Sequence, residues 1–102
     1  MITTVDGLRH GQLVRSIQGR DRNDYYLIAG MVGDRFIKAV NGKNHPWAKP
    51  KSKNLKHVKV TMLVAKDIEK SLVNGESIRD TEIVSTIKRL SKELEEGDRL
   101  DG

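Results

Sequence analysis

The chain has 102 residues and a formal charge of +5, because its 19 Lys and Arg residues outnumber its 14 Asp and Glu residues. This length suits one small domain. The absence of cysteine excludes disulfides, Cys-based zinc sites, iron–sulfur clusters and thiol catalysis. No apolar run approaches the roughly 20 residues that span a bilayer, and no apolar leader follows the first methionine. The composition therefore predicts a soluble, cytoplasmic protein that does not contact membranes.

The charge is divided unevenly along the chain. Residues 1–60 hold 12 basic and 4 acidic residues, a net charge of +8, whereas residues 61–102 hold 7 basic and 10 acidic residues, a net charge of −3. The densest basic segment, residues 49–59, has five lysines, one histidine and no acidic residue. Such a local field attracts polyanions. Composition leaves two interpretations of this segment open: a nucleic-acid contact, or a solvated loop.

The first part of the chain has the pattern of short strands joined by turns. Residues 1–7 are expected to be a flexible lead-in. β-Branched and aromatic residues predict strands over 12–18, 25–32, 35–40 and 57–65. Asn41-Gly42 is the strongest hairpin signal, because both central positions of a type I′ turn need positive φ. Pro46 and Pro50 argue against a central strand in the lysine-rich stretch near them.

After residue 65 the pattern becomes helical. A short helix is predicted over residues 66–73, and a longer one from about residue 80 to residue 96. The longer segment has an apolar stripe at helical spacing. The stripe consists of Ile83, Val84, Ile87, Leu90 and Leu94. Packing of this stripe on the strands is the simpler expectation, and a surface for a partner protein is the alternative. Two heptads are too few to predict a dimer, so a monomer is assumed.

These elements together predict a mainly β fold. Short strands at intervals of about 8 to 12 residues are typical of a small barrel. We therefore expect a barrel over residues 8–65, followed by a C-terminal helical extension over residues 66–102.

The segment from Gly11 to Asp21, GQLVRSIQGRD, resembles a KOW motif, which is a strand–loop–strand unit with a central glycine, here Gly19. Over about residues 8–61 the chain is similar to KOW-domain RNA-binding proteins, which are related to KOW-bearing proteins of the eukaryotic-type large ribosomal subunit. The similarity rests on VRS at 14–16, GRD at 19–21, YLI at 26–28, NGK at 41–43, KPKSKN at 49–54 and KH at 56–57. One departure is Asn41, where the family more often has Asp.

The resemblance extends more loosely to the C-terminal part, where NGESIRDTEI at 74–83 is similar to a helical extension seen in such proteins. The resemblance as a whole implies an SH3-like barrel, RNA as the ligand, and a place in or near translation.

The candidate RNA-binding residues lie in two segments. Arg20 and Arg22 flank Asp21, which either pairs with them locally or orders the loop so that a guanidinium reaches a phosphate. The remaining candidates are Lys49, Lys51, Lys53, Lys56, His57 and Trp47. Lysine supplies charge without distinguishing bases, so these lysines are expected to position RNA. Trp47 either stacks on a base or covers one end of the barrel.

The sequence predicts neither catalysis nor a cofactor. His45, His57 and a lysine are the ingredients of a metal-independent ribonuclease, but nothing in the sequence brings them together. His10, His45 and His57 lack the ligand spacing of a metal site. Aromatic residues make up only 4% of the chain, which favours recognition of folded RNA by shape and backbone.

The predicted function is therefore non-catalytic binding of structured RNA, either ribosomal RNA or another part of the translation machinery. The alternative is a protein-interaction module, in which the barrel or the C-terminal helix binds a component of transcription or translation.

Overall fold

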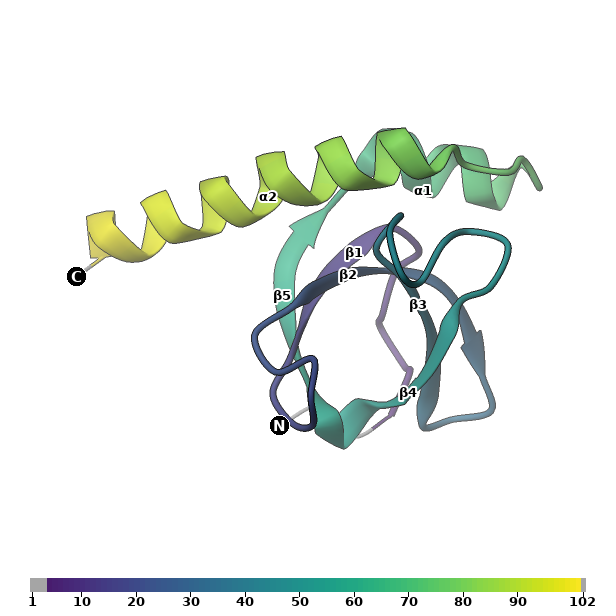
Figure 1. Cartoon of the computed structure of the whole chain (residues 1–102), viewed down its shortest axis with the longest axis horizontal. Coiled ribbons are helices and arrows are strands. Elements are labelled where there is room, and N and C mark those ends of the chain that lie inside the picture. Colours follow the sequence, from purple (N-terminus) through teal and green to yellow (C-terminus); the bar gives the residue numbers. More distant parts are fainter. Residues whose placement is uncertain (1–3, 102) are drawn as a thin grey trace.

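The computed structural model describes residues 4–101 of the chain, with side chains described up to residue 96. Five strands precede two helices, and a 3-10 turn joins the last two strands (Figure 1). The elements are β1 (Gln12–Ser16), β2 (Tyr25–Val32), β3 (Phe36–Val40), β4 (Lys51–Asn54), η1 (Leu55–His57), β5 (Val58–Val64), α1 (Lys66–Val73) and α2 (Asp80–Asp101). Helix and strand occupy about 30% and 31% of the chain, so the fold is mixed α/β, and the expected mainly β class is wrong.

The five strands form one sheet in the order β4-β3-β2-β1-β5, and every neighbouring pair is antiparallel. Figure 1 shows that the sheet curls, with η1 passing between its two edges. No hydrogen-bonded ladder joins β4 to β5 in the described part of the chain, so the sheet is open and the expected closed barrel is not found. β4 is short because Pro50 precedes it and η1 follows it directly, which leaves little strand for a further ladder.

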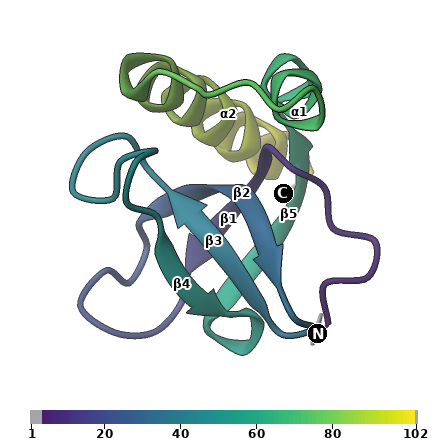
Figure 2. The same ribbon diagram turned by 90° about the vertical axis from the view of Figure 1, so that its right-hand side faces the viewer.

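Alternation along the strands sends apolar side chains to both faces of the sheet. An inner cluster lies within the curl and contains Val14, Tyr26, Ile28, Ile37, Ala39, Leu55 and Val58. An outer cluster joins the opposite face to the helices and contains Leu13, Leu27, Val40, Ala65, Ile68, Ile78, Ile83 and Leu90. Figure 2 shows both helices on this one side of the sheet. The small sheet therefore has two apolar faces, and the helices cover the outer one.

The apolar stripe of α2 packs on the sheet, which confirms the simpler of the two expectations for it. Ile83 and Leu90 are only 1% and 5% exposed, and Ile87 and Leu94 are half-buried against the same outer cluster. The helix continues to Asp101, beyond the predicted end near residue 96, and its C-terminal part projects past the sheet (Figure 1).

The chain between β3 and β4 does not form the predicted two-residue hairpin. Ten residues, 41–50, connect these strands, and Gly42 has a φ of +76° whereas Asn41 is not among the residues with positive φ. The side-chain oxygen of Asn41 accepts hydrogen bonds from the backbone N–H groups of Lys43 and His45, both at 3.0 Å. A local turn built on this side chain therefore replaces the hairpin.

The chain before β1 is held against the sheet and α1, and Val5 of the predicted lead-in takes part in this. The backbone N–H of Val5 donates to the Asp34 carbonyl at 2.9 Å, and Val5 and Leu8 pack against the inner cluster. Arg9 forms an ion pair with Glu69 of α1. Of the lead-in predicted over residues 1–7, residues 1–3 lie outside the described part of the chain.

Candidate nucleic-acid interface

A shielded ion pair connects the loop between β1 and β2 to the edge strand β4. The Nζ of Lys53 lies 2.7 Å from Oδ2 of Asp21, and the two side chains are only 7% and 11% exposed. Lys53 is buried because its side chain lies on the inner face of β4, toward the curl of the sheet. Lys51, two positions earlier, lies on the same face. The pair joins two segments that are separated by about thirty residues in the sequence.

Two further groups donate hydrogen bonds to the Asp21 carboxylate. The Tyr26 hydroxyl donates at 2.6 Å and the Ser16 hydroxyl at 3.0 Å, while Lys53 Nζ also donates to Ser16 at 3.0 Å. Burial alone raises the pKa of Asp21, but hydrogen bonds from Lys53, Tyr26 and Ser16 and the lysine charge outweigh it, so the pKa lies well below its ordinary value. Asp21 is therefore held ionised at neutral pH.

The pKa of Tyr26 is raised far above its ordinary value. Burial is the largest cause, and the hydrogen bond to Asp21 adds to it. Tyr26 thus stays protonated as a donor, and its ring also lies 5.7 Å from Lys53 Nζ. The four side chains of Ser16, Asp21, Tyr26 and Lys53 form a closed polar network between three strands and the loop.

This network differs from one expectation of the sequence, and from one of the two alternatives that the sequence left open for Asp21. Lys53 was expected to contact phosphate, but its ammonium is buried and its donors are directed to Asp21 and Ser16. A local ion pair of Asp21 with Arg20 or Arg22 is also absent among the described side chains. The alternative expectation, in which Asp21 orders the loop, agrees with its hydrogen bonds.

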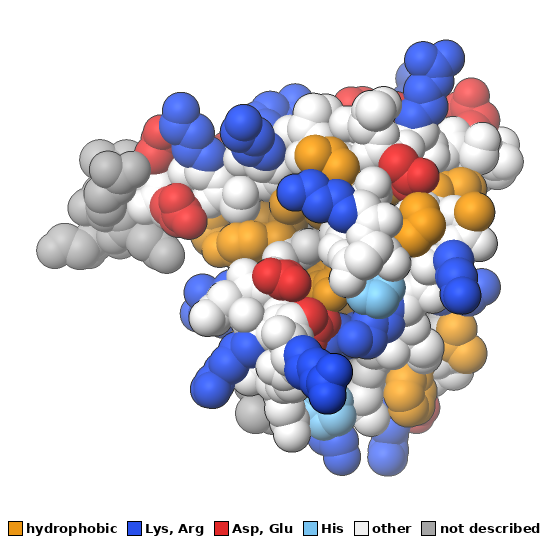
Figure 3. All heavy atoms as spheres, viewed as in Figure 1, with side chains coloured by type: hydrophobic (Ala, Val, Ile, Leu, Met, Phe, Trp, Pro, Cys, Tyr) orange, Lys and Arg blue, Asp and Glu red, His pale blue; other side chains and the backbone are white. Residues whose placement is uncertain are grey.

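The other predicted cations are more exposed than Lys53. Arg20, Arg22, Lys49 and Lys56 are exposed, and Lys51 is half-buried with its Nζ 3.7 Å from Asp21. We call these five residues the basic surface. Figure 3 shows Lys and Arg side chains spread over the sheet and loop part of one face, around a small acidic area. Apart from that contact of Lys51, the described carboxylates form no ion pair with them.

The two remaining candidates, Trp47 and His57, are half-buried. Trp47 packs against the outer cluster, and its backbone N–H donates to the Asp80 carboxylate at 2.7 Å at the start of α2. The backbone carbonyl of His57 accepts from Ile17 at 3.0 Å. Trp47 therefore packs outside the curl of the sheet, against the outer cluster, rather than over one end of the barrel.

Sequence reasoning missed polar residues that only the tertiary structure brings together. Arg15 of β1 lies opposite Lys59 of β5 in the register, and the Arg15 Nε is buried without a hydrogen-bond partner among the described atoms. Lys43 and Lys88 line a common groove although they lie 45 positions apart. The only sequence signal for Arg15 was its alternation with apolar neighbours. No pattern in the sequence pointed to Lys88.

The described residues contain no group of three or more His, Asp or Glu side chains arranged to hold a metal ion. None of the helices described for residues 4–101 is long and apolar enough to cross a membrane. The chain matches no known protein-family model and no curated protein sequence.

Proposed function

We propose that the protein is a non-catalytic RNA-binding protein that docks on structured RNA through the basic surface. The ligand we favour is ribosomal RNA or another RNA of the translation machinery. The observation that carries this proposal is the buried Asp21–Lys53 pair, because it ties the loop bearing Arg20 and Arg22 to the strand bearing Lys51. Cations from two distant segments are thereby presented together.

The KOW resemblance supports the same function. It carries with it the further proposal that the curled sheet is an SH3-like sheet of the KOW type, left open between β4 and β5. The strand order and the 3-10 turn between the last two strands are compatible with this relationship. RNA as the ligand is then supported by the resemblance as well as by the charge.

The chemistry of the basic surface suits the sugar–phosphate backbone. Arg20 and Arg22 present planar guanidinium groups that can meet two phosphate oxygens each. The lysines contribute charge without base preference. Because the Asp21 network already orders the loop, less conformational entropy is lost when the arginines bind.

The dependence of RNA affinity on salt tests this proposal. If the five cations each neutralise one phosphate, a plot of log affinity against log salt has a slope of about −4 for a structured RNA hairpin. Changing Lys51 and Lys56 together to Gln is expected to make this slope shallower by about 1.5 to 2.

The matched control changes Lys66 and Lys70 of α1 to Gln, since both are exposed and lie outside the basic surface. It removes the same charge and is expected to leave the slope near that of the parent. Equal slopes for the two double variants, or no measurable RNA binding by the parent, would contradict the proposal.

A second function has one observation in its favour. A groove of about 390 Å³ between β5 and the projecting part of α2 is lined by Tyr25, Met62 and Leu94, and Met62 is 92% exposed. Such an apolar surface suits a protein partner. Co-sedimentation with ribosomal subunits distinguishes the two: RNA docking is lost at high salt, whereas an apolar protein contact survives high salt and is lost in Met62→Glu.

A further inference from the structure

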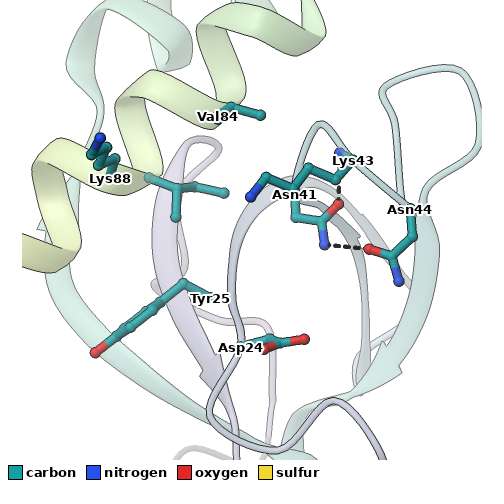
Figure 4. A pocket seen from close by; sticks show the side chains of 8 residues that line it. Asp24, Tyr25, Asn41, Lys43, Asn44, Val84 and Lys88 are labelled. Carbon is teal, nitrogen blue, oxygen red and sulfur yellow. Dashed lines mark hydrogen bonds between the residues drawn. The ribbon is translucent and has the colours of Figure 1, made fainter.

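A groove of about 540 Å³ adjoins the loop that carries Arg20 and Arg22. It lies between the end of that loop, the β3–β4 connection and α2 (Figure 4). The residues that matter here are Asp24, Tyr25, Lys43, Asn44, Ile87 and Lys88. Its volume falls within the range of roughly 300 to 1,000 Å³ that is usual for small-molecule sites.

One part of the groove is apolar. Tyr25 and Ile87 are half-buried and pack against the outer cluster, so each keeps part of its side chain accessible to the groove. Tyr25 comes from the sheet and Ile87 from α2 (Figure 4 shows Tyr25 and the helix). An aromatic and an aliphatic side chain that border the same groove suit a flat, π-bearing ligand such as a nucleobase.

The polar side chains of the groove include Asn44, Asp24, Lys43 and Lys88. Asn44 accepts a hydrogen bond from Asn41 at 2.8 Å through its side-chain oxygen, which leaves its amide N–H groups as donors. The Asp24 side chain is exposed and forms no hydrogen bond or ion pair with other described side chains. Lys43 and Lys88 are both exposed.

The carboxylate of Asp24 decides which part of a nucleotide can lie beside it. It repels a phosphate, but it accepts a hydrogen bond from an exocyclic amine, as Asp does from N4 of cytosine. A phosphate is instead favoured near the ammonium groups of Lys43 and Lys88. The groove therefore offers an acceptor and a donor for a base edge, and separate cations for the backbone.

We propose that this groove binds one unpaired nucleotide of the RNA, with an amino-bearing base such as cytosine beside Asp24. The base packs on Tyr25 and Ile87, and the adjoining phosphate lies near Lys43 or Lys88. This inference rests on the proposed RNA-binding function. The groove adjoins the loop of the basic surface, because Asp24 ends the loop that carries Arg20 and Arg22, and its backbone N–H donates to the Asp21 carbonyl at 2.9 Å.

Three RNAs of the same stem test the inference with the full chain: a fully paired duplex, the duplex with one bulged cytosine, and the duplex with one bulged uracil. Fluorescence anisotropy at one low salt concentration gives the affinities. The parent is expected to bind the cytosine bulge about tenfold more tightly than the paired duplex. The uracil bulge should fall between them, because it packs but lacks the exocyclic amine.

Asp24→Ala is the decisive variant, because it removes the acceptor and also one negative charge. We expect the preference for cytosine over uracil to disappear, while affinity for the paired duplex stays equal or rises slightly. Asp34→Ala is the matched control, because this substitution removes the same charge at an exposed position. The Asp34 side chain is 78% exposed in the turn between β2 and β3. This control should retain the preference of the parent.

Lys88→Gln provides a second variant on another element, in case the loop is disturbed. It is expected to weaken binding of both bulged RNAs about threefold more than binding of the duplex. Equal binding of paired and bulged RNAs by the parent overturns the inference, as does a cytosine preference that survives Asp24→Ala. Tight binding of free cytidine monophosphate with no preference among the RNAs also overturns it. Failure to bind any of the three RNAs instead overturns the proposed function.

Discussion

At the scale of single residues, one carboxylate organises the proposed interface. Asp21 accepts from a lysine on β4, a tyrosine on β2 and a serine on β1. A buried ion pair is not by itself a source of stability, because both charges lose hydration. Its consequence here is positional, because it ties the loop that carries Arg20 and Arg22 to β4.

Asp21→Asn tests the role of this pair in stability. The substitution leaves the Lys53 ammonium buried without a counter-charge, so the free energy of unfolding is expected to fall by about 3 to 5 kcal/mol. Urea unfolding measures the change. Asp34→Asn, at an exposed turn, should change it by less than about 0.5 kcal/mol.

The double variant Asp21→Asn with Lys53→Met shows whether the loss comes from the unpaired charge. Removing the stranded ammonium should recover much of the stability. If Asp21→Asn alone unfolds like the parent, the pair has no structural role.

The pH dependence of stability follows from the lowered pKa of Asp21. A group whose folded-state pKa is depressed contributes stability that is fully present above its ordinary pKa and is lost as the pH falls toward the folded value. The parent should therefore lose stability below about pH 4. Asp21→Asn should lack this component of the acid dependence, which urea unfolding at several pH values measures.

At the scale of elements, the β3–β4 connection is shaped by contact with α2. A Cβ on Gly42 would lie 2.5 Å from the Asp80 carbonyl oxygen and 2.9 Å from Val84, and the residue has a positive φ. The Asp80 carboxylate also accepts from the Trp47 backbone. The start of α2 therefore holds this connection at two points, which keeps Asn44 and Lys43 beside the groove.

Gly42→Ala is expected to destabilise the protein more than Gly75→Ala. Both glycines have φ near +77°, so both variants incur the cost of about 1 to 2 kcal/mol for a left-handed L-residue. Only Gly42 has backbone in the way of a Cβ, whereas Gly75 faces open space within 4 Å. Thermal unfolding of the two variants isolates the steric part as their difference. Equal losses would mean that the connection moves away from α2 without cost.

At the scale of the whole molecule, the sheet and the helices share one apolar cluster. Leu13, Leu27 and Val40 come from residues 8–65, and Ile68, Ile83 and Leu90 come from residues 66–102. The range predicted as a helical extension thus supplies half of the outer core. A cluster that includes both ranges favours cooperative unfolding of the whole chain.

We expect a single unfolding transition with the same midpoint by Trp47 fluorescence and by far-ultraviolet circular dichroism. Leu90→Ala should lower the free energy of unfolding by about 2 to 5 kcal/mol and move both midpoints together. Arg89→Ala is the matched control, because Arg89 is exposed and should change stability by less than about 0.5 kcal/mol. Separate midpoints for the two signals would show that the helices unfold independently of the sheet.

The sequence by itself predicted the local structure wherever short-range patterns decide it. The strand over residues 25–32 and the helix over residues 66–73 have the predicted bounds, because aromatic and β-branched content favours a strand and Asn74-Gly75 ends a helix. The apolar stripe of α2 identified its buried face, because side-chain periodicity reports which face of an element is buried. The local charge density likewise indicated the segment of residues 49–59, in which Lys49 and Lys56 are exposed.

Only the tertiary structure decided what distant residues do together. Lys53 looked like its neighbouring lysines, but pairing of β4 with β3 turns it toward Asp21, a partner that no local pattern identifies. The residue types of Asn41-Gly42 strongly favour a hairpin. In the structure these residues form a different turn, and Gly42 lies against α2. Asp24, Asn44 and Lys88 form a groove only because a loop, a connection and a helix meet there. Such contacts depend on long-range packing, which local sequence patterns do not encode.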